Sequence, residues 1–202
     1  MIRICGVRLS SSMDENAIKA AIPAQWLEAW RAAHPRLCRP SAMLQSLAGL
    51  WLLQRSGAEG ALSYTALGKP LLSGTQIGIT HTAEQVFCAV SDGESPVGID
   101  AEEVNGRLDG DRRQAMAKRW FSDAEQALAM ASEREFYRVW TRKEAYVKMT
   151  GEGLCGVRAV DTEAASCSFS SFFEGDAVVT VAHARSEEVE QKIEMLNPSK
   201  GT

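Results

Sequence analysis

The chain has 202 residues, 45% hydrophobic and 24% charged, a composition typical of a globular protein rather than a disordered one. Its net charge of −4 argues against a nucleic-acid binder that relies on a general positive field. Five scattered cysteines without a C-x-x-C pair argue against a disulfide scaffold or a structural zinc site. The N-terminus does not resemble a signal peptide, and no apolar run is long enough to span a membrane, so we expect a cytoplasmic protein.

Residues 1–95 predict a first half of α+β type. A strand is expected first, then two helices, then a turn that carries a lysine, then a two-stranded hairpin. These elements are Ile2–Leu9, Ala17–Ala33, Ser41–Arg55, Leu67–Leu72, and the pair Ile77–His81 and Val86–Val90. The turn-rich stretch Ser91–Pro96 marks the boundary to the second half.

Residues 96–202 predict a second half with a similar order of elements. A short strand at Val97–Ile99 is followed by three helices, a short run around Val157–Val160, and a hairpin. The helices are Asn105–Arg119, one that begins with the capping box Ser122–Glu125, and 133–150; the hairpin strands are Cys167–Phe173 and Ala177–His183. The charged tail from Ser186 is expected to be a frayed helix or an unstructured end.

Two carboxylates follow the strand that opens the second half. Residues two apart in a strand point to the same side, so Asp100 and Glu102 would project together. Neighbouring carboxylates repel each other unless a cation bridges them, and oxygen ligands suit Mg²⁺. The alternative interpretation is a polar edge strand with two solvated acids.

The helix at 133–150 carries a second charged pair. Glu144 and Lys148 lie four residues apart and share a face, which by itself predicts only a solvated salt bridge. The apolar stripe that includes Phe136 and Val147 would face the core, and Gly151 would end the helix.

Further candidates occur in the first half. Arg36 and Arg39 precede the second helix, where two guanidiniums could hold a phosphate or could simply be solvated. His81 ends a predicted strand between Thr80 and Thr82, and it could be structural or part of an anion cradle.

The joint spacing of several motifs resembles the signature of the 4′-phosphopantetheinyl transferases. The motifs are Val97-Gly-Ile-Asp-Ala-Glu102, Phe121-Ser-x-x-Glu125 and Trp140-Thr-x-Lys-Glu-Ala-x-x-Lys148-x-x-Gly-x-Gly153. The Gly68-Lys-Pro70 turn and the Thr80-His81-Thr82 strand end are also similar to that family. The resemblance covers roughly residues 36–155. It favours the long, monomeric branch of the family, the type that activates surfactin synthetase.

The resemblance implies a fold and a set of site residues. The fold would be two similar α+β halves about a pseudo-twofold axis, with coenzyme A and the active site in the cleft between them. Asp100, Glu102 and Glu144 would ligate Mg²⁺, with Mn²⁺ as an alternative. Lys148, Lys69 and His81 would contact the phosphates of coenzyme A, with Thr80 where the family often has serine.

The sequence departs from the family pattern at one position. Gln45 falls near the position where the long branch usually carries an arginine for the 3′-phosphate of coenzyme A. Arg39, or else Arg36, is therefore the candidate for that contact.

The implied reaction moves the 4′-phosphopantetheine arm of coenzyme A to a serine of an apo acyl or peptidyl carrier protein in fatty-acid or secondary-metabolite biosynthesis. A metal and Lys148 would stabilise charge on the pyrophosphate, and Glu144 would take the proton of the serine directly or through water. Two alternatives remain open: a magnesium-dependent phosphodiester hydrolase, and a non-catalytic binder of carrier proteins.

Overall fold

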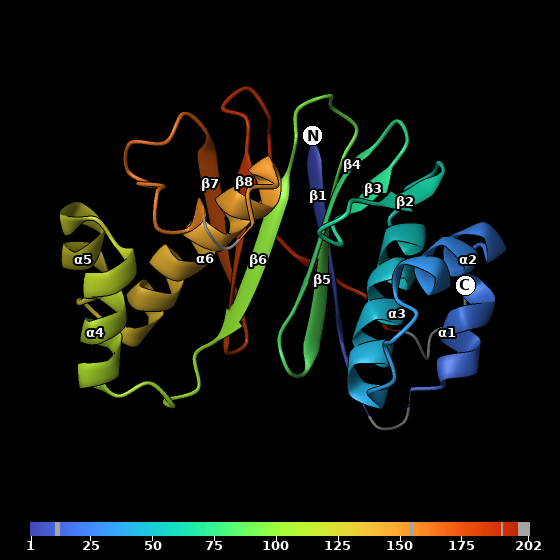
Figure 1. Cartoon of the computed structure of the whole chain (residues 1–202), viewed down its shortest axis with the longest axis horizontal. Helices are drawn as coiled ribbons and strands as arrows, with labels where there is room; N and C mark the ends of the chain where they lie inside the picture. The colour runs from blue at the N-terminus through green and yellow to red at the C-terminus, as the bar shows by residue number, and fades with distance from the viewer. Residues whose placement is uncertain (11–12, 154–155, 191, 198–202) are drawn as a thin grey trace.

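The computed structural model describes residues 1–10, 13–153, 156–190 and 192–197. Two sheets face each other in the middle of the molecule, and helices cover the outer face of each (Figure 1). The four layers are therefore helix, sheet, sheet and helix, which confirms the prediction of an α+β protein. No helix in the described ranges combines the length and the apolar character needed to cross a bilayer.

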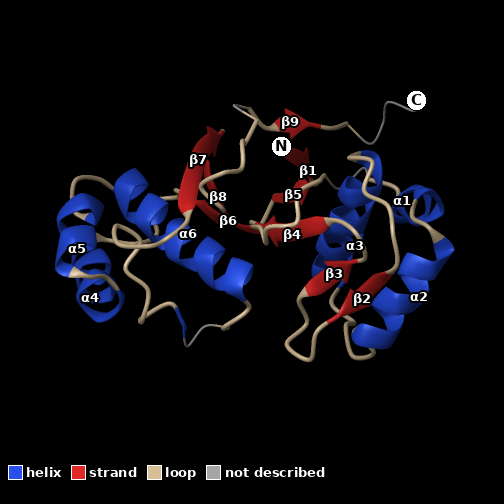
Figure 2. Ribbon diagram, turned by 90° about the horizontal axis from the view of Figure 1, so that it is seen from above, coloured by secondary structure: helices blue, strands red, loops and turns tan. Residues whose placement is uncertain are grey.

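The first sheet has the strand order β4-β5-β1-β9. Its strands are β1 (Ile2–Arg8), β4 (Gln76–His81), β5 (Gln85–Ser91) and β9 (Glu194–Met195), and the first three pair antiparallel. Its outer face carries α1 (Glu15–Ala21), α2 (Ala24–Ala33) and α3 (Pro40–Arg55), whose buried side chains pack with the sheet in one core cluster. A small ribbon of β2 (Leu62–Tyr64) and β3 (Pro70–Leu72) lies beside α2 (Figure 2).

The second sheet has the order β6-β8-β7, and all of its pairs are antiparallel. Its strands are β6 (Gly98–Glu103), β7 (Ser168–Glu174) and β8 (Ala177–His183). Helices α4 (Gly110–Trp120), α5 (Asp123–Ala129) and α6 (Glu133–Thr150) lie on its outer side. Among them α6 packs directly on β6 and β8, so it is the helix that can bring side chains to the acidic strand β6.

Apolar side chains between the two sheets join the halves of the molecule. Ile4 and Phe87 from the first sheet and Ile99 and Val179 from the second have no exposed surface and belong to one cluster. Burial of this kind stabilises by about 1.5–3 kcal/mol for each large side chain. The contact between the sheets places β4 beside β6, where the candidate site lies.

Both ends of α6 are capped. The Ser132 hydroxyl accepts a hydrogen bond from the Glu135 amide at 3.1 Å, which satisfies one of the free donors of the first turn. Gly151 closes the helix with a left-handed φ of 81°, a conformation that favours glycine. The predicted bounds, 133–150, are confirmed, and so is the capping box at Ser122.

Three predicted elements differ from the structure. The helix expected over 17–33 is two helices, because Pro23 has no amide hydrogen to continue the first and instead precedes α2. The helix expected from Asn105 begins at Gly110, where the Asp109 carboxylate caps it by accepting from the Arg112 amide at 2.8 Å. The run around Val157–Val160 lies in turns.

The tail from Ser186 is not a frayed end within its described residues. Val189 forms a bridge with Ile2, and Glu194–Met195 pairs in parallel with Cys5–Gly6 as strand β9. The expectation of a frayed helix or unstructured end is therefore wrong for this part, because β1 offers an open edge whose backbone groups need partners. Residues 191 and 198–202 of the predicted tail, and the last two residues of the stretch 36–155, lie outside the described residues.

Candidate functional site

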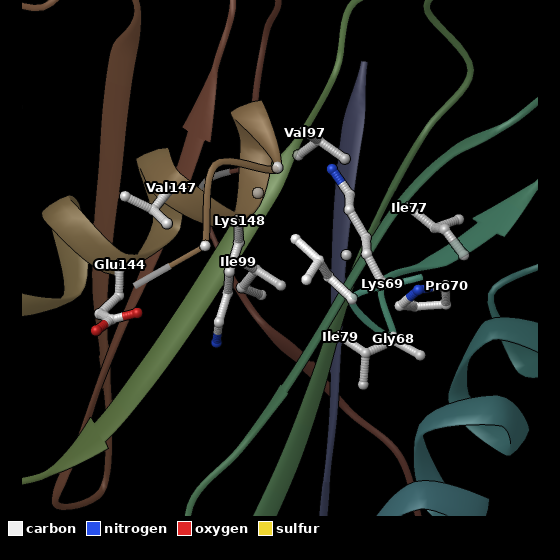
Figure 3. A pocket seen from close by; sticks show the side chains of 15 residues that line it. Gly68, Lys69, Pro70, Ile77, Ile79, Val97, Ile99, Glu144, Val147 and Lys148 are labelled. Atoms are coloured by element: carbon white, nitrogen blue, oxygen red, sulfur yellow. The ribbon is translucent and has the colours of Figure 1, made fainter. Parts of the chain in front are cut away.

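A cavity of about 330 Å³ lies between β4, β6 and the C-terminal part of α6. Its walls are mainly apolar, and Glu144, Lys148 and Lys69 are the charged side chains among its lining residues. Figure 3 shows Lys69 and Lys148 reaching into it from opposite sides. The cavity thus joins a turn of the first half to a helix of the second. The apolar residues that form its walls are Leu67, Pro70, Ile77, Ile79, Val97, Ile99 and Val147.

The site depends on a close approach between strand β6 and helix α6 at Gly98. A Cβ atom on Gly98 would lie 2.0 Å from the carbonyl oxygen of Ala145 and 2.5 Å from the amide nitrogen of Met149. Only a residue without a side chain fits there. Because the helix lies directly on the strand, side chains of α6 can reach Asp100, two residues along β6.

A buried acid on β6 is paired with the lysine of α6. Lys148 Nζ lies 2.5 Å from Asp100 Oδ1 and donates a second hydrogen bond, of 3.2 Å, to the Thr80 hydroxyl. Thr80 Oγ1 is itself 3.4 Å from the same Asp100 oxygen. Thr80 is on β4, so one cluster draws side chains from β4, β6 and α6. The second oxygen of Asp100 is buried and has no hydrogen-bond partner within the described part of the chain.

Two more carboxyls lie close enough to feel the charge of Asp100. The pKa of Glu102 is raised to about 7, mainly by burial and then by the charge of Asp100, with a smaller contribution from Glu144. A hydrogen bond with the Trp140 side chain and the Lys148 ammonium act in the opposite direction. Burial also raises the pKa of Glu144, as does Asp100, against the opposing effect of Lys148. Glu102 and Glu144 therefore lie in an electrostatic environment in which negative charge is costly.

His81 lies at the edge of the same cluster. Its side chain is exposed at the end of β4. Partial desolvation lowers the pKa of its imidazole, the Lys148 ammonium lowers it too, and a backbone hydrogen bond with Thr82 and the Asp100 carboxylate oppose them. These influences place the ring within electrostatic range of both members of the Lys148–Asp100 pair.

Lys69 connects the two sides of the cavity. Its Nζ donates a hydrogen bond of 3.1 Å to the carbonyl oxygen of Met149, in the last turn of α6. Desolvation lowers the pKa of its ammonium. The carbonyl groups at a helix C-terminus have no partner within the helix, so a lysine there is a favourable contact.

The donor set of this cluster suits a hard cation. Carboxylate oxygens are what Mg²⁺ prefers, one oxygen of Asp100 is buried without a partner, and two neighbouring acids resist ionisation where they lie. Within the described ranges, however, no three His, Cys, Asp or Glu side chains converge as a ready-made metal site. At Asp100 the neighbouring positive charge is the Lys148 ammonium.

The structure does not bring the candidate arginines into this cluster. Arg36 and Arg39 are exposed ahead of α3 and are absent from the lining of the cavity. Gln45 has a defined role in the fold, since its Nε2 donates to the Thr82 carbonyl oxygen at 2.9 Å and so ties α3 to the turn after β4.

The sequence predicts the charged residues of the site but not the apolar wall of the cavity between them. The apolar lining residues look like ordinary core positions in the sequence, and nothing distinguishes Ile77 or Ile99 from their buried neighbours. Gly98 carried a usable signal, because a glycine inside a strand often marks a close approach of another backbone.

Comparison with known proteins points to one family. A family model described as the 4′-phosphopantetheinyl transferase superfamily matches residues 96–191. The chain is 28% identical over 169 residues to a protein named 4′-phosphopantetheinyl transferase from Bacillus subtilis, an alignment that covers 76% of this chain and 72% of that protein.

Two further relatives carry the same kind of name. The chain is 30% identical over 130 residues to 4′-phosphopantetheinyl transferase HetI of a Nostoc species, which covers 59% of this chain and 53% of the relative. It is 34% identical over 126 residues to 4′-phosphopantetheinyl transferase AcpT of Salmonella typhi. This alignment covers 55% of this chain and 64% of the relative. The alignments thus span 72% of the Bacillus subtilis relative and about half of HetI.

Proposed function

We propose that the chain is a member of the 4′-phosphopantetheinyl transferase superfamily and that it transfers the 4′-phosphopantetheine arm of coenzyme A to a serine of an apo acyl or peptidyl carrier protein. The other product is adenosine 3′,5′-bisphosphate. The main support for the proposal is that Thr80, Asp100 and Lys148 contact one another beside a cavity whose walls come from both sheets.

In the proposed arrangement the two halves, residues 1–95 and 96–202, are related by a pseudo-twofold axis, with the site in the cleft between them. In support, each half runs from one strand through three helices to an antiparallel hairpin: β1, α1–α3 and β4–β5 in the first, β6, α4–α6 and β7–β8 in the second. Two features depart from this shared order: the β2–β3 ribbon lies between α3 and β4, and strand β9 adds to the sheet of the first half. We expect a monomer, as in the long branch of the family.

The acidic cluster would hold Mg²⁺, with Mn²⁺ as an alternative, through Asp100, Glu102 and Glu144. A divalent ion bound there would offset the negative charge of the pyrophosphate of coenzyme A. Its binding would also offset the repulsion by Asp100, which after burial is the next largest cause of the raised pKa of Glu102 and of Glu144.

The lysines and His81 would bind the phosphates. Lys148 is 39% exposed, so its ammonium is already in contact with solvent. It can therefore leave Asp100 and bind a phosphate oxygen. Lys69 already lies at the opposite side of the cavity, and His81 and Thr80 lie at the end of β4 beside the acids. The apolar walls would accept the uncharged parts of coenzyme A next to these cations.

The chemical step needs a base for the serine. In the proposed step the serine oxygen forms a bond to the phosphorus that carries the pantetheine arm, and the bond to the bridging oxygen of the pyrophosphate breaks. The electron pair leaves with adenosine 3′,5′-bisphosphate, while Glu144 takes the serine proton directly or through a water molecule. Glu144 and Lys148 both line the cavity and lie one turn apart, so the base and the phosphate-binding lysine would act from the same face of α6.

Mass spectrometry of a panel of apo carrier proteins tests the proposed function. Each carrier is incubated with the protein, coenzyme A and Mg²⁺, and we expect a mass gain of one phosphopantetheine arm on at least one of them. Release of adenosine 3′,5′-bisphosphate without that gain would identify a hydrolase. Carrier binding with neither product would identify a non-catalytic binder.

A test of Arg39 addresses the adenine end of coenzyme A. If Arg39 binds the 3′-phosphate, Arg39→Ala should weaken binding of coenzyme A by about tenfold, as expected for a lost hydrogen bond to a charged group. Binding of 3′-dephospho-coenzyme A should not change. Calorimetry with both ligands measures this, and Arg31→Ala, another exposed arginine, is the control. Equal weakening of the two ligands would show that Arg39 does not contact the 3′-phosphate.

The family resemblance implies a carrier that is acidic around its modified serine, and two arginines on α4 are the candidates for steering such a carrier. Arg112 and Arg119 are exposed; the first lies 3.6 Å from the Asp109 carboxylate and the second 5.0 Å from the centre of the Trp120 ring. Changing both to glutamate should raise KM for the carrier at low salt and leave kcat nearly unchanged, because charges at the edge of an interface mainly affect association. The matched control is the pair Arg31→Glu with Arg55→Glu, on the opposite flank of the molecule. A carrier KM that does not rise would show that Arg112 and Arg119 are solvated and do not contribute to carrier binding.

A further inference from the structure

The residue immediately before Glu144 is a lysine with no exposed surface. Lys143 Nζ lies 2.9 Å from Glu125 Oε2 and also donates to the carbonyl oxygen of Val160. The Phe121 ring covers the same ammonium, 5.9 Å from its centroid. This lysine does not line the cavity, so the phosphates of a bound coenzyme would not reach it.

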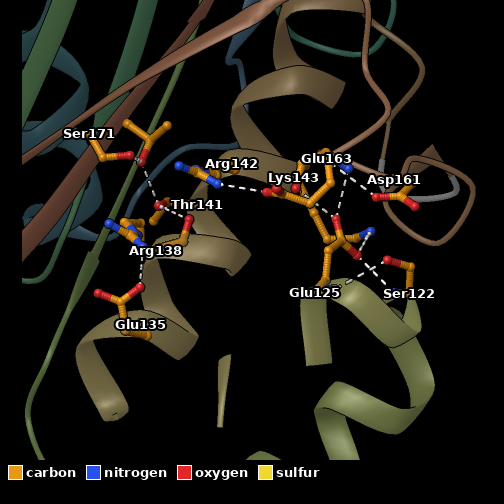
Figure 4. Close-up of polar contacts among 12 residues, drawn as sticks. Ser122, Glu125, Glu135, Arg138, Thr141, Arg142, Lys143, Asp161, Glu163 and Ser171 are labelled. Atoms are coloured by element: carbon orange, nitrogen blue, oxygen red, sulfur yellow. Dashed lines mark hydrogen bonds and ion pairs between the residues drawn. The ribbon is translucent and has the colours of Figure 1, made fainter. Parts of the chain in front are cut away.

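The partner of Lys143 is equally buried and fully hydrogen bonded. Glu125 Oε2 also accepts from the Ser122 amide at 2.8 Å, and Oε1 accepts from the amide and the hydroxyl of Thr162, both at 2.8 Å. One carboxylate therefore joins the start of α5, the middle of α6 and the segment that follows α6. Figure 4 shows these contacts converging on Glu125.

A second polar chain holds α6 from the side of the sheet. The Thr141 hydroxyl is 2.8 Å from the Thr180 hydroxyl on β8, which is 2.9 Å from the Ser171 hydroxyl on β7. Successive residues of a helix are about 100° apart, so Thr141 and Lys143 point in nearly opposite directions. The helix is thus held on two sides by directional contacts, just before Glu144.

We propose that the Glu125–Lys143 pair is a positioning device that sets the rotation of α6 about its axis and thereby places Glu144 and Lys148 against Asp100. The inference rests on the proposed transfer reaction. Apolar side chains of similar size often stabilise a fold as well as a buried ion pair does. What they cannot supply is a fixed direction, which this pair provides through the hydrogen bonds of Lys143 to Glu125 and Val160 and those of Glu125 to Ser122 and Thr162.

The expected size of the effect follows from helix geometry. A rotation of about 10° moves a side-chain group at the outer radius of a helix, about 5–6 Å, by about 1 Å. A misplacement of that size at a reacting centre can cost about 100-fold in rate. Glu144 and Lys148 would both move, since they lie on the same face of α6.

The test is the double variant Glu125→Gln with Lys143→Met, which removes both charges and keeps the approximate volumes. We expect a folded protein whose kcat falls by about 100-fold, while KM for coenzyme A rises far less, since Lys69 and the apolar walls stay in place and only Lys148 shifts. Binding of Mn²⁺ in the presence of coenzyme A, followed by electron paramagnetic resonance, should weaken as well. The control is Arg142→Gln with Glu163→Gln, which removes the neighbouring ion pair of 3.0 Å at the surface of the same helix.

A folded double variant with kcat and Mn²⁺ affinity near those of the wild type would overturn the proposal. If the double variant does not fold, Glu125→Asp decides, because it keeps the charge pair but shortens one arm; normal kcat and normal Mn²⁺ affinity would then contradict positioning. A wild-type protein that transfers no arm would refute the proposed reaction alone. In that case, weaker Mn²⁺ binding by the double variant would still support positioning, and unchanged binding would refute it.

Discussion

Replacing Asp100 with asparagine is expected to lower kcat for phosphopantetheine transfer by about 100- to 1,000-fold, the range seen when a preorganised electrostatic group is lost. Asp100 is the acid that contacts Lys148 and Thr80 and that raises the pKa of both Glu102 and Glu144. It therefore lies at the centre of the proposed metal site. The measurement is kcat as a function of Mg²⁺ concentration, and higher Mg²⁺ should recover part of the loss.

The same variant should remain folded, which separates a functional effect from a structural one. One oxygen of Asp100 is buried without a partner, and its charge opposes two neighbouring acids, so its removal relieves unfavourable interactions. Lys148 loses its partner but is 39% exposed and can be hydrated. Asp92→Asn, at a 72% exposed acid, is the control. Near-normal kcat of Asp100→Asn at limiting Mg²⁺ would show that the site is wrongly assigned.

Replacing Gly98 with alanine is expected to reduce both stability and activity. The new methyl group would lie 2.0 Å from the Ala145 carbonyl oxygen and 2.5 Å from the Met149 nitrogen, and both are backbone atoms that cannot turn away. Helix α6 must then lift from β6, which separates Lys148 from Asp100. We expect a loss of about 3 kcal/mol in the free energy of unfolding, the upper end for overpacked positions, and a fall in kcat among the molecules that remain folded.

Urea denaturation followed by circular dichroism measures this loss as a lower midpoint at an unchanged m-value. Gly110→Ala is the matched control, because a Cβ there would meet no atom within 4 Å and Gly110 has no positive φ. That variant should be neutral or stabilised by about 0.4–1 kcal/mol. A Gly98→Ala protein with the stability of Gly110→Ala would mean that β6 and α6 are not held at this distance.

Several elements could be predicted from the sequence because local patterns determine them. The bounds of α6 follow from the Ser132 cap, the apolar stripe and Gly151, all of which lie within the helix or next to it. Strand β6 follows from its short apolar run, and the two-residue period puts Asp100 and Glu102 on the side of α6, where they meet Lys148 and Trp140. The spacing of these motifs was also sufficient to suggest the family.

What the sequence by itself determined is therefore the local element and the type of side chain it carries, whereas the contacts between elements were decided only by tertiary structure. The Lys148–Asp100 pair, the Glu125–Lys143 pair and the pairing of β9 with β1 all join segments that are distant in the chain. Hydrophobic periodicity shows which face of a helix is buried but not which partner it meets or how closely. That distance depends on the packing of whole layers, and at Gly98 it depends on the absence of a single Cβ atom.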